Sequence, residues 1–291
     1  MGKIVIFGHT GFIGRALHEH LLGTSGGQVM GFSSEAVDLR RRDGLHILEG
    51  LVDQNAIVIF ASAITPEKGD SLDVLVQNTL MAGHLGMLLE AHPPAKCVCF
   101  SSDVVYPMQD DPITEKTSVH PRGTFYGIAK YATECVLRRS AESGGFPLLV
   151  LRPTGVFGAG DTHGVYGPNA FLRTLINDRA VRLFGDGEEK RDHLYIGDLV
   201  RLVGSLLAVD AVGVYNLATG VSHSYAEVVE CLRRVVPFDF SLSRVPRRGP
   251  VTHRCFDISR LRAQVPQFRF TSMEQGLREA FMRLSLAPDR V

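Results

Sequence analysis

The stretch KIVIFGHTGFIGRALHEHLLG, residues 3–23, decides the fold of this chain. KIVIFG is an apolar run with β-branched residues, and it predicts a buried parallel strand. A glycine turn follows and enters a helix. Gly8 permits the tight turn, Gly11 lets the backbone approach a pyrophosphate, and Gly14 allows close helix–strand packing. The stretch therefore predicts a dinucleotide at the helix N-terminus, where unpaired N–H groups face an anion.

The spacing of these glycines is GxxGxxG, which differs by one residue from the common GxGxxG fingerprint. Three turn glycines that hold no ligand remain the alternative. The strand before the turn and the helix after it favour the dinucleotide.

Strands and helices alternate through the first half of the chain, which predicts a doubly wound parallel sheet of the α/β class. After Pro153 the alternation gives way to the glycine-rich TGVFGAGDTHGVYGPN, a candidate domain transition. The expected further strands are QVMGF (28–32), NAIVIFAS (55–62), KCVCFSS (96–102) and PLLVLRP (147–153), and the expected helices cover 44–52, 72–92 and the YGIAK segment to about 142.

Tyr126 and Lys130 stand four apart in FYGIAK. Side chains at i and i+4 project from one face of a helix, so a phenol and an ammonium can share a pocket there. The ammonium is expected to lower the pKa of the phenol toward the range of an acid–base catalyst. A YxxxK pair alone is a weak signal, because it arises by chance on many helices.

Composition excludes several classes of function. The chain has 291 residues and a formal net charge of zero, so no basic excess suggests a nucleic-acid surface. Its five cysteines include no CxxC pair, which indicates a reduced compartment and no zinc site. No HExxH is present, and His18 and His20 are expected on the surface of the first helix. No leader and no membrane span is expected, and a cytoplasmic location follows.

Several strings in a fixed order carry a family resemblance that runs almost end to end. The chain resembles the extended short-chain dehydrogenases/reductases, which include sugar-nucleotide epimerases, dehydratases and ketoreductases. The strings are GHTGFIG, FSSDVVY, YGIAK, LLVLRPTGVFGAG, LFGDGEEKRDHLYIGDLV, GVYNLATG and DISRLRAQVPQFRFTSMEQGL.

The resemblance implies a Rossmann-type domain and a smaller, discontinuous C-terminal substrate domain. The first would cover 1–165 with return segments at about 190–220. The second would cover about 166–189 and 221–291. Resemblance also implies a homodimer that pairs through the helix at 72–92 and the YGIAK helix, and two-fold homodimers are the commonest assemblies.

Catalysis would then belong to Ser102, Tyr126 and Lys130. The resemblance implies that Ser102 hydrogen-bonds the reacting oxygen and that Tyr126 takes or returns the alcohol proton while hydride moves to or from the nicotinamide. Lys130 would steady the phenolate and bond the nicotinamide ribose. The hydride chemistry belongs to the cofactor.

The choice of cofactor depends on the end of the second strand, GFSSE. Ser33 stands where NAD users of the family tend to have aspartate, and Arg40 or Arg41 could supply charge for the extra phosphate of NADP. These arginines could instead coat a solvated turn, and Glu35 could serve NAD. The sequence favours NADP over NAD. The expected cofactor-binding residues are Gly8, Thr10, Gly11, Phe12, Ile13, Gly14, Ser33, Asp38, Leu39, Arg40, Ala61, Ala63, Tyr126 and Lys130.

The second half of the chain suggests a nucleotide-sugar substrate. By resemblance Arg191 grips the diphosphate, and a guanidinium matches phosphate geometry bidentately. A salt bridge from Arg191 to an acidic neighbour is the alternative. Asn169 and Arg248 lie where relatives touch the diphosphate or the base, and Asp103 follows the catalytic serine.

The reaction itself stays open between two classes. Dehydratases of the family place an Asp-Glu pair after the serine or threonine, whereas Asp103 is followed by Val104, so dehydration is not expected. An epimerase is slightly favoured over an NADPH-dependent 4-ketoreductase of a nucleotide 4-keto-6-deoxyhexose. A non-catalytic, NADP-responsive regulator is the alternative from another class, since function belongs to the site and not the fold.

Overall fold

The computed structural model describes residues 2–48, 50–109, 111–121, 123–161, 166–247 and 249–286. The chain divides into two compact units. Unit 1 comprises Met1–Pro107, Glu115–Pro153 and Val203–Asn216, and unit 2 comprises Met108–Thr114, Thr154–Leu202 and Leu217–Val291.

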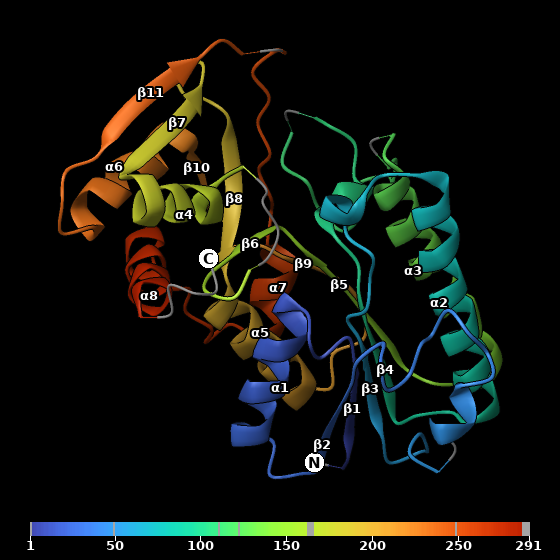
Figure 1. Ribbon diagram of the computed structural model, residues 1–291. Helices are drawn as coiled ribbons and strands as arrows, with labels where there is room; N and C mark the ends of the chain where they lie inside the picture. Colours follow the sequence, from blue (N-terminus) through green and yellow to red (C-terminus); the bar gives the residue numbers. More distant parts are fainter. Residues whose placement is uncertain are drawn as a thin grey trace. The chain divides into compact units, whose positions relative to one another are not determined.

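Unit 1 is built on a six-stranded sheet with the order β2-β1-β3-β4-β5-β9 (Figure 1). Strand β1 pairs in parallel with β2 and β3, and β4 pairs in parallel with β3 and β5. The order reverses at β1, and in such sheets ligands bind outside the carboxyl ends of the strands at that point. The strands are β1 (Ile4–Phe7), β2 (Val29–Phe32), β3 (Ile57–Phe60), β4 (Lys96–Phe100), β5 (Leu148–Pro153) and β9 (Gly213–Leu217).

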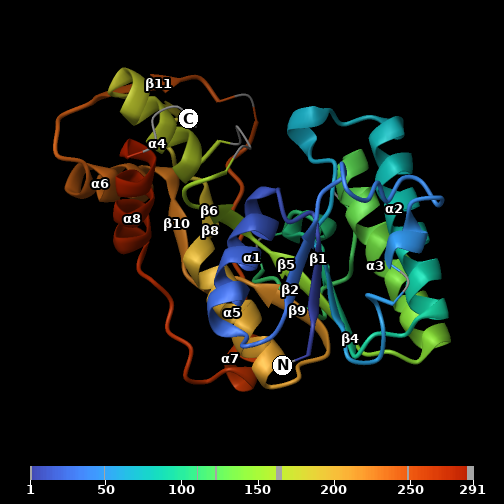
Figure 2. The same cartoon turned by 60° about the horizontal axis from the view of Figure 1, so that its bottom comes forward.

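Helices cover both faces of this sheet, as Figures 1 and 2 show, with α1 on one face and the packed pair α2 and α3 on the other. The side chains of Ser71 and Thr124 accept the first backbone N–H bonds of α2 and α3, and Gly145 ends α3 in the left-handed region with φ 68°. The helices are α1 (Phe12–Thr24), α2 (Leu72–Ala91), α3 (Phe125–Gly144) and α5 (Ile196–Ala208), with 3₁₀ turns η1 (Leu45–Leu48), η2 (Pro66–Lys68) and η3 (Asp103–Val105).

The expected α/β class and parallel sheet are confirmed, but the expected helix over 44–52 is wrong. Among the described residues of this range, the helical structure is limited to the 3₁₀ turn η1. Gly50 has a φ of +82°, which a helix cannot contain, and glycines flank the short apolar segment at both ends.

Helix α2 also corrects an expectation from composition. Its 20 residues are long and apolar enough to cross a membrane. Its Leu85 and Leu89 are fully buried in the core of unit 1, where they lie with Phe7, Val58 and Leu137. Such burial is what a core helix of an α/β sheet shows, because it packs one face against the strands.

Among the described residues, unit 2 contains two small sheets, four complete helices and the first part of α5, up to Leu202. Strand β8 pairs with β6 and β10, and β7 pairs with β11. A capping box between Ser224 and Glu227 begins α6, which packs against α8. The strands are β6 (Gly155–Phe157), β7 (Ala180–Phe184), β8 (Lys190–Tyr195), β10 (Ser222–Ser224) and β11 (Ser241–Val245), and the helices are α4 (Pro168–Asp178), α6 (Tyr225–Val235), α7 (Ser259–Gln264) and α8 (Met273–Ser285).

The boundary between the units lies earlier than the sequence suggests. Residues 154–161 and 190–202, expected in the first domain, group with unit 2. The reason is strand pairing: β8 pairs with β6 and β10, so both segments are held in the three-stranded sheet.

Candidate active site

The glycine turn between β1 and α1 leaves no room for side chains. A Cβ at Gly14 would lie 2.7 Å from the carbonyl carbon of Gly8, and a Cβ at Gly8 would lie 2.8 Å from the backbone nitrogen of Ser62. Gly8 has a φ of +84°, which favours glycine. Close approach of β1, α1 and the loop after β3 therefore requires glycine at both positions.

The N-terminus of α1 is open to an anion. Its N-cap is Gly11, which provides no side-chain cap, and the first turn contains no acidic residue. Thr10 is exposed and Ile13 half-buried, whereas Phe12 is buried against the core. The first N–H groups of α1 can therefore face a pyrophosphate, so this turn fits a dinucleotide.

His9 was not singled out from the sequence, although it lies within the glycine motif. A Cβ at Gly31 of β2 would come within 2.7 Å of the Cβ of His9, so the imidazole occupies the space that a side chain on β2 would fill. The ring lies 5.4 Å from that of His18, which is half-buried rather than on the surface. The absent side chain of Gly31 is the only sequence signal for this packing.

At the end of β2 the candidate NADP residues are engaged with one another. Arg40 donates to Asp38 through Nε at 2.8 Å and Nη2 at 2.7 Å, and this contact holds the pKa of Asp38 below its usual value. Arg41 pairs with Asp43 in the same way. Both pairs are exposed, and exposed pairs contribute little to stability, so either arginine can leave its partner. Ser33 accepts only a long bond, 3.4 Å, from the backbone of Ala36.

The other candidate cofactor residues lie after β2 and β3. Leu39 is 3% exposed and packs in the core, so only its backbone is open to a ligand. Ala61 and Ala63 are half-buried in the loop after β3. The amide of Asn78 on α2 accepts from Ile64 N at 2.8 Å and donates to Ile64 O at 3.0 Å, so it holds this loop in place. Asn78 was not singled out in the sequence analysis.

The three candidate catalytic residues all belong to unit 1. Helix α3 carries Tyr126 and Lys130, and Ser102 caps η3 by accepting from Val104 N at 3.3 Å. Helix α3 packs on η3 so closely that a Cβ at Gly127 would lie 3.3 Å from the backbone oxygen of Val104. This glycine therefore lets the first turn of α3 approach the turn that carries Ser102.

The lysine and the tyrosine are positioned by backbone contacts. Lys130 is 7% exposed, and its Nζ donates to the backbone oxygen of Phe100 at 2.9 Å. The same Nζ lies 5.7 Å from the centroid of the Tyr126 ring. The backbone N–H of Tyr126 donates to Asp70 at 3.0 Å. The ammonium and the phenol therefore share one face of α3, as the i, i+4 spacing predicts.

The expected lowering of the phenol pKa is not found in this structure. Burial, and after it the carboxylates of Asp103 and Glu67, raise the pKa of Tyr126 well above its usual value. Burial also lowers the pKa of Lys130. The surroundings of the phenol therefore favour its neutral form until a positive charge arrives beside it.

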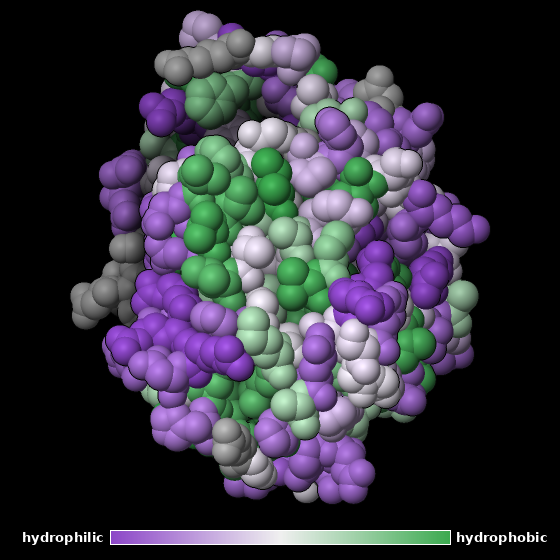
Figure 3. Space-filling view, turned by 90° about the vertical axis from the view of Figure 1, so that its right-hand side faces the viewer, coloured by the Kyte–Doolittle hydropathy of each residue, from purple (hydrophilic) through white to green (hydrophobic). Residues whose placement is uncertain are grey.

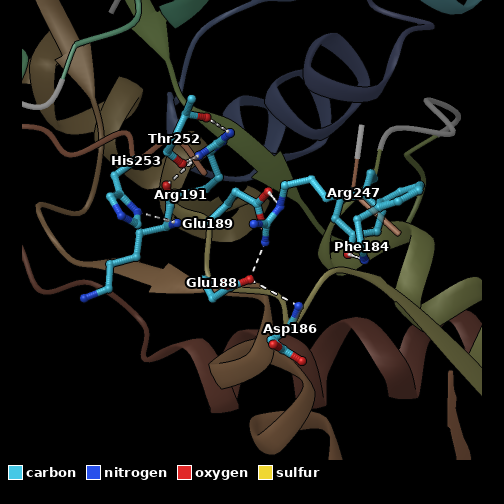
Figure 4. Close-up of polar contacts among 10 residues, drawn as sticks. Phe184, Asp186, Glu188, Glu189, Arg191, Arg247, Thr252 and His253 are labelled. Atoms are coloured by element: carbon cyan, nitrogen blue, oxygen red, sulfur yellow. Dashed lines mark hydrogen bonds and ion pairs between the residues drawn. The ribbon is translucent and has the colours of Figure 1, made fainter. Parts of the chain in front are cut away.

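In unit 2, no ion pair from Arg191 is found among the described residues. Its Nη1 donates to the backbone oxygen of Thr252 at 2.6 Å and its Nη2 to the hydroxyl of Thr252 at 3.1 Å (Figure 4). The alternative of a structural salt bridge is thus not what the described contacts show. Asp192 lies on the opposite face of β8, where Thr219, Gly220 and Thr154 donate to it and burial raises its pKa to about 6.

Asn169 is buried, and both polar atoms of its side-chain amide already form hydrogen bonds. Its Oδ1 accepts from Gly158 N at 2.9 Å, and its Nδ2 donates to Asp161 at 2.6 Å, which Arg173 also contacts. These contacts tie the start of α4 to the loop after β6. A substrate would have to displace one of them to reach the amide.

Arg248 lies outside the described residues, and the neighbouring Arg247 stands beside the loop that leads to Arg191. Figure 4 shows its guanidinium between Glu188 and Glu189, with which it forms ion pairs. Arg247 was not singled out from the sequence, where Arg248 of the same PRRGP stretch was the candidate.

A cavity of about 740 Å³ also lies within unit 2, lined by residues that include Phe157, His193, Tyr195, His223 and Phe268. Its described lining includes neither Asn169 nor Arg191. The cavity is therefore separate from the residues for which the sequence suggested substrate contacts.

Comparisons with known proteins agree with this arrangement. The model of a family described as NAD dependent epimerase/dehydratase matches residues 4–218. An uncharacterized UDP-glucose epimerase of Bacillus subtilis is 29% identical over 245 residues, which cover 70% of this chain and 72% of that protein. A dTDP-4-dehydro-6-deoxyglucose reductase of Escherichia coli is 30% identical over 137 residues, 45% of this chain and 42% of that protein.

Among solved structures, UDP-N-acetylglucosamine 4-epimerase of Methanobrevibacter ruminantium, in complex with UDP-N-acetylmuramic acid, superimposes with a TM-score of 0.85. It is 23% identical and the match covers 99% of this chain and 98% of that one. At this identity the likeness concerns the fold. The chain spans about half the length, or less, of several curated relatives that it matches.

Proposed function

Because this chain belongs to the NAD dependent epimerase/dehydratase family, we propose that it moves a hydride to or from a hydroxyl-bearing carbon of a nucleotide sugar, and that it acts as an epimerase. The observation that carries this proposal is the convergence of Ser102, Tyr126 and Lys130 where α3 packs on η3. An alcohol oxidation needs a proton acceptor, a hydroxyl to hold the reacting oxygen and a nearby cation, and these three residues are of those types.

In this mechanism Tyr126 takes the proton of the substrate hydroxyl and returns it in the reverse step, and Ser102 holds the reacting oxygen. Lys130 supports the phenolate by its charge. A bound nicotinamide supplies the hydride acceptor and, when oxidised, a positive charge. The raised pKa of Tyr126 makes the phenol a proton donor at rest, and it becomes a base only when positive charge gathers beside it.

The substrate side is proposed for unit 2. Arg191 offers a guanidinium whose described partners are Thr252 and the backbone of Lys190, both neutral, so its charge is available to a diphosphate. Arg247 is a second candidate, held by Glu188 and Glu189. Asp103 is proposed to contact the sugar, because its carboxylate acts on the phenol of Tyr126.

A 4-ketoreductase of a nucleotide 4-keto-6-deoxyhexose is the second candidate. Ser33, rather than an acidic residue, stands at the end of β2, and we propose NADP over NAD on this ground. The engagement of Arg40 with Asp38 reduces the charge that it offers to a phosphate. The E. coli relative that matches 45% of the chain is a reductase of this type.

One experiment separates the two reactions. The purified protein is incubated with nucleotide hexoses and with nucleotide 4-keto-6-deoxyhexoses, each with NAD, NADH or NADPH. An epimerase converts a hexose with no net change in absorbance at 340 nm, whereas a ketoreductase consumes NADPH in proportion to product. Absence of turnover with every member of both panels, from a folded protein that binds the cofactor, would contradict the proposal.

We also propose a homodimer, with a second copy of this chain as the partner of the α2–α3 face. Figure 3 shows apolar side chains gathered on the face where these helices lie. Leu72, Val76 and Leu80 recur every fourth residue on α2 and are 61%, 47% and 43% exposed, and Ile128 on α3 is 40% exposed. A stripe of this kind can meet its own copy across a two-fold axis.

A further inference from the structure

Helix α3 carries a buried carboxylate that the mechanism above does not use. Glu134 stands one turn beyond Lys130 and is fully buried. Arg152 of β5, only 3% exposed, donates to it through Nε at 2.9 Å and Nη2 at 2.6 Å. Two parallel bonds between a guanidinium and a carboxylate fix both distance and orientation. The pair therefore holds α3 at one register on the sheet.

The end of β4 is tied to the same face of α3. Phe100 accepts from Lys130, the next residue Ser101 donates from its hydroxyl to Glu134, and the residue after that is Ser102. Two consecutive positions of the strand end are thus bonded to side chains that flank one turn of α3. The third position is the candidate catalytic hydroxyl.

The network also reaches the far side of η3. Arg152 donates through Nη1 to the hydroxyl of Tyr106 at 2.7 Å, and Tyr106 donates to Asn216 at 2.7 Å. Tyr106 ends the turn that Ser102 begins. Arg152 therefore contacts, through one guanidinium, both the helix that bears Tyr126 and the turn that bears Ser102.

We propose that Glu134, held by Arg152, is a positioning residue of the proposed active site, which sets where Lys130 and Tyr126 lie relative to Ser102. Its effect on turnover rests on the proposed function. Its effect on Lys130 does not, because the carboxylate of Glu134 acts on the charge of Lys130 in the protein without substrate.

A role in stability alone makes a different prediction. Replacing a buried ion pair by apolar side chains of similar volume is often neutral or stabilising, whereas removing one partner leaves a buried charge unpaired. If the pair serves only to stabilise the fold, replacing both residues by apolar side chains leaves kcat unchanged. If it positions the triad, the same replacement preserves folding and lowers turnover.

The charge of Glu134 also acts on Lys130. Burial lowers the pKa of Lys130, while Cys99 of β4 and Glu134 of α3 raise it, and Arg152 faces the same group of side chains from β5. Glu134 raises the pKa of Lys130, whereas the charge of Arg152 acts on Cys99, so loss of the pair is expected to remove support for the ammonium of Lys130. The ammonium of Lys130 then gives up its proton at lower pH.

The test compares Glu134→Met/Arg152→Met with wild type. We expect the double variant to fold, with kcat lowered at least about tenfold and KM for cofactor and substrate changed less than about threefold. KM changes little because the binding groups are still present, whereas kcat falls because the residues that transfer the proton are no longer held in position. Lys96→Met is the matched control. Lys96 is 3% exposed at the opposite end of β4, where it pairs with Asp210, and its loss should leave kcat unchanged.

A second measurement needs no substrate. The chain has six lysines, so the ¹³Cε signal of Lys130 can be followed against pH by NMR and assigned with Lys130→Met. We expect its titration midpoint to fall by about one pH unit in the double variant and in Glu134→Gln, because a neighbouring charge in a buried site acts on this scale.

The two readouts decide the inference together. A folded double variant that keeps wild-type kcat and the wild-type Lys130 midpoint overturns it. If wild type turns over no nucleotide sugar, the proposed function fails while the Lys130 titration still decides the positioning role. If the double variant does not fold, Glu134→Gln supplies the midpoint, and an unchanged midpoint there overturns the inference as well.

Discussion

The carbonyl of Gly8 fills the space that a side chain on Gly14 would need: a Cβ there would lie 2.7 Å from its carbonyl carbon. The neighbour is backbone and cannot give way as a flexible side chain can. This contact joins the end of β1 to the first turn of α1, and it sets the shape of the turn that fits a dinucleotide.

Gly14→Ala is therefore expected to destabilise the protein by about 1–3 kcal/mol and to weaken cofactor binding, because overpacking displaces the turn. The matched control is Gly23→Ala near the end of the same helix, where a Cβ meets nothing within 4 Å. That change should be neutral or stabilising, since alanine has the higher helix propensity. Urea unfolding measures the free energy of unfolding of each variant, and fluorescence titration with NADPH measures its affinity for the cofactor. Equal effects from the two substitutions would show that the Gly8 contact does not matter.

Tyr126→Phe removes the proposed proton-transfer group and little else. We expect kcat to fall by about 10² to 10⁴, the usual contribution of a positioned acid–base group, with cofactor affinity and melting temperature near wild type. Stopped-flow or steady-state assays on the accepted nucleotide sugar give kcat. Retention of full activity would remove the phenol from the mechanism.

Arg191→Lys tests the proposed diphosphate contact, because an ammonium cannot form the paired bonds of a guanidinium. We expect KM for the nucleotide sugar to rise about tenfold, equivalent to about 1.4 kcal/mol, with a smaller change in kcat. Arg182→Lys on the exposed side of β7 is the control and should behave as wild type. An unchanged KM in the Arg191 variant would assign this arginine to structure.

His193 makes stability depend on pH. It is 8% exposed, and burial, then His223 and Arg191, lower its pKa from 6.5 to about 3. Because the folded-state pKa is depressed, the unfolded chain binds the proton first as pH falls below 6.5. Stability from this group is therefore present above pH 6.5 and is lost between 6.5 and 3, by about 1.4 kcal/mol per pH unit.

The measurement is the free energy of unfolding in urea from pH 7 to pH 4, for wild type and His193→Gln. The difference between the two curves isolates this histidine from other titrating groups such as Asp192. We expect the wild type to lose stability more steeply. Parallel curves would mean that His193 is protonated as readily in the folded protein as in the unfolded chain.

Val76→Glu tests the proposed homodimer. In a two-fold dimer each copy would carry the new carboxylate, and both charges would be buried in an apolar contact away from water. Dissociation to monomers is therefore expected at micromolar concentration. Val209→Glu is the control, since Val209 is 46% exposed and Val76 is 47% exposed. Light scattering with size exclusion gives the mass. A wild-type monomer would contradict the proposal, and a wild type found only with lipid would assign the face to a membrane.

Local features of this chain were predictable because they depend on neighbours in sequence. The strand at residues 4–7 follows from a continuous apolar run, the turn after it from its glycines, and the shared face of Tyr126 and Lys130 from the period of 3.6 residues. The helix expected at 44–52 failed, because a short apolar segment between glycines carries no reliable period. Arg248, which the sequence suggested for substrate contact, lies outside the described residues and stays a prediction.

The order of residues along the chain was enough to predict the class of fold, the glycine turn and the shared helix face of Tyr126 and Lys130, because each rests on a short-range pattern, while Ser102 was predicted from the family resemblance. Tertiary structure alone decided that Glu134 meets Arg152, eighteen residues away, and that Tyr106 meets Asn216, 110 residues away. It also decided the sign of the pKa shift of Tyr126, because burial and the carboxylates of Asp103 and Glu67 act through space. Packing and electrostatics depend on the distance between groups in the folded protein, and the number of residues between two positions in the sequence does not give that distance.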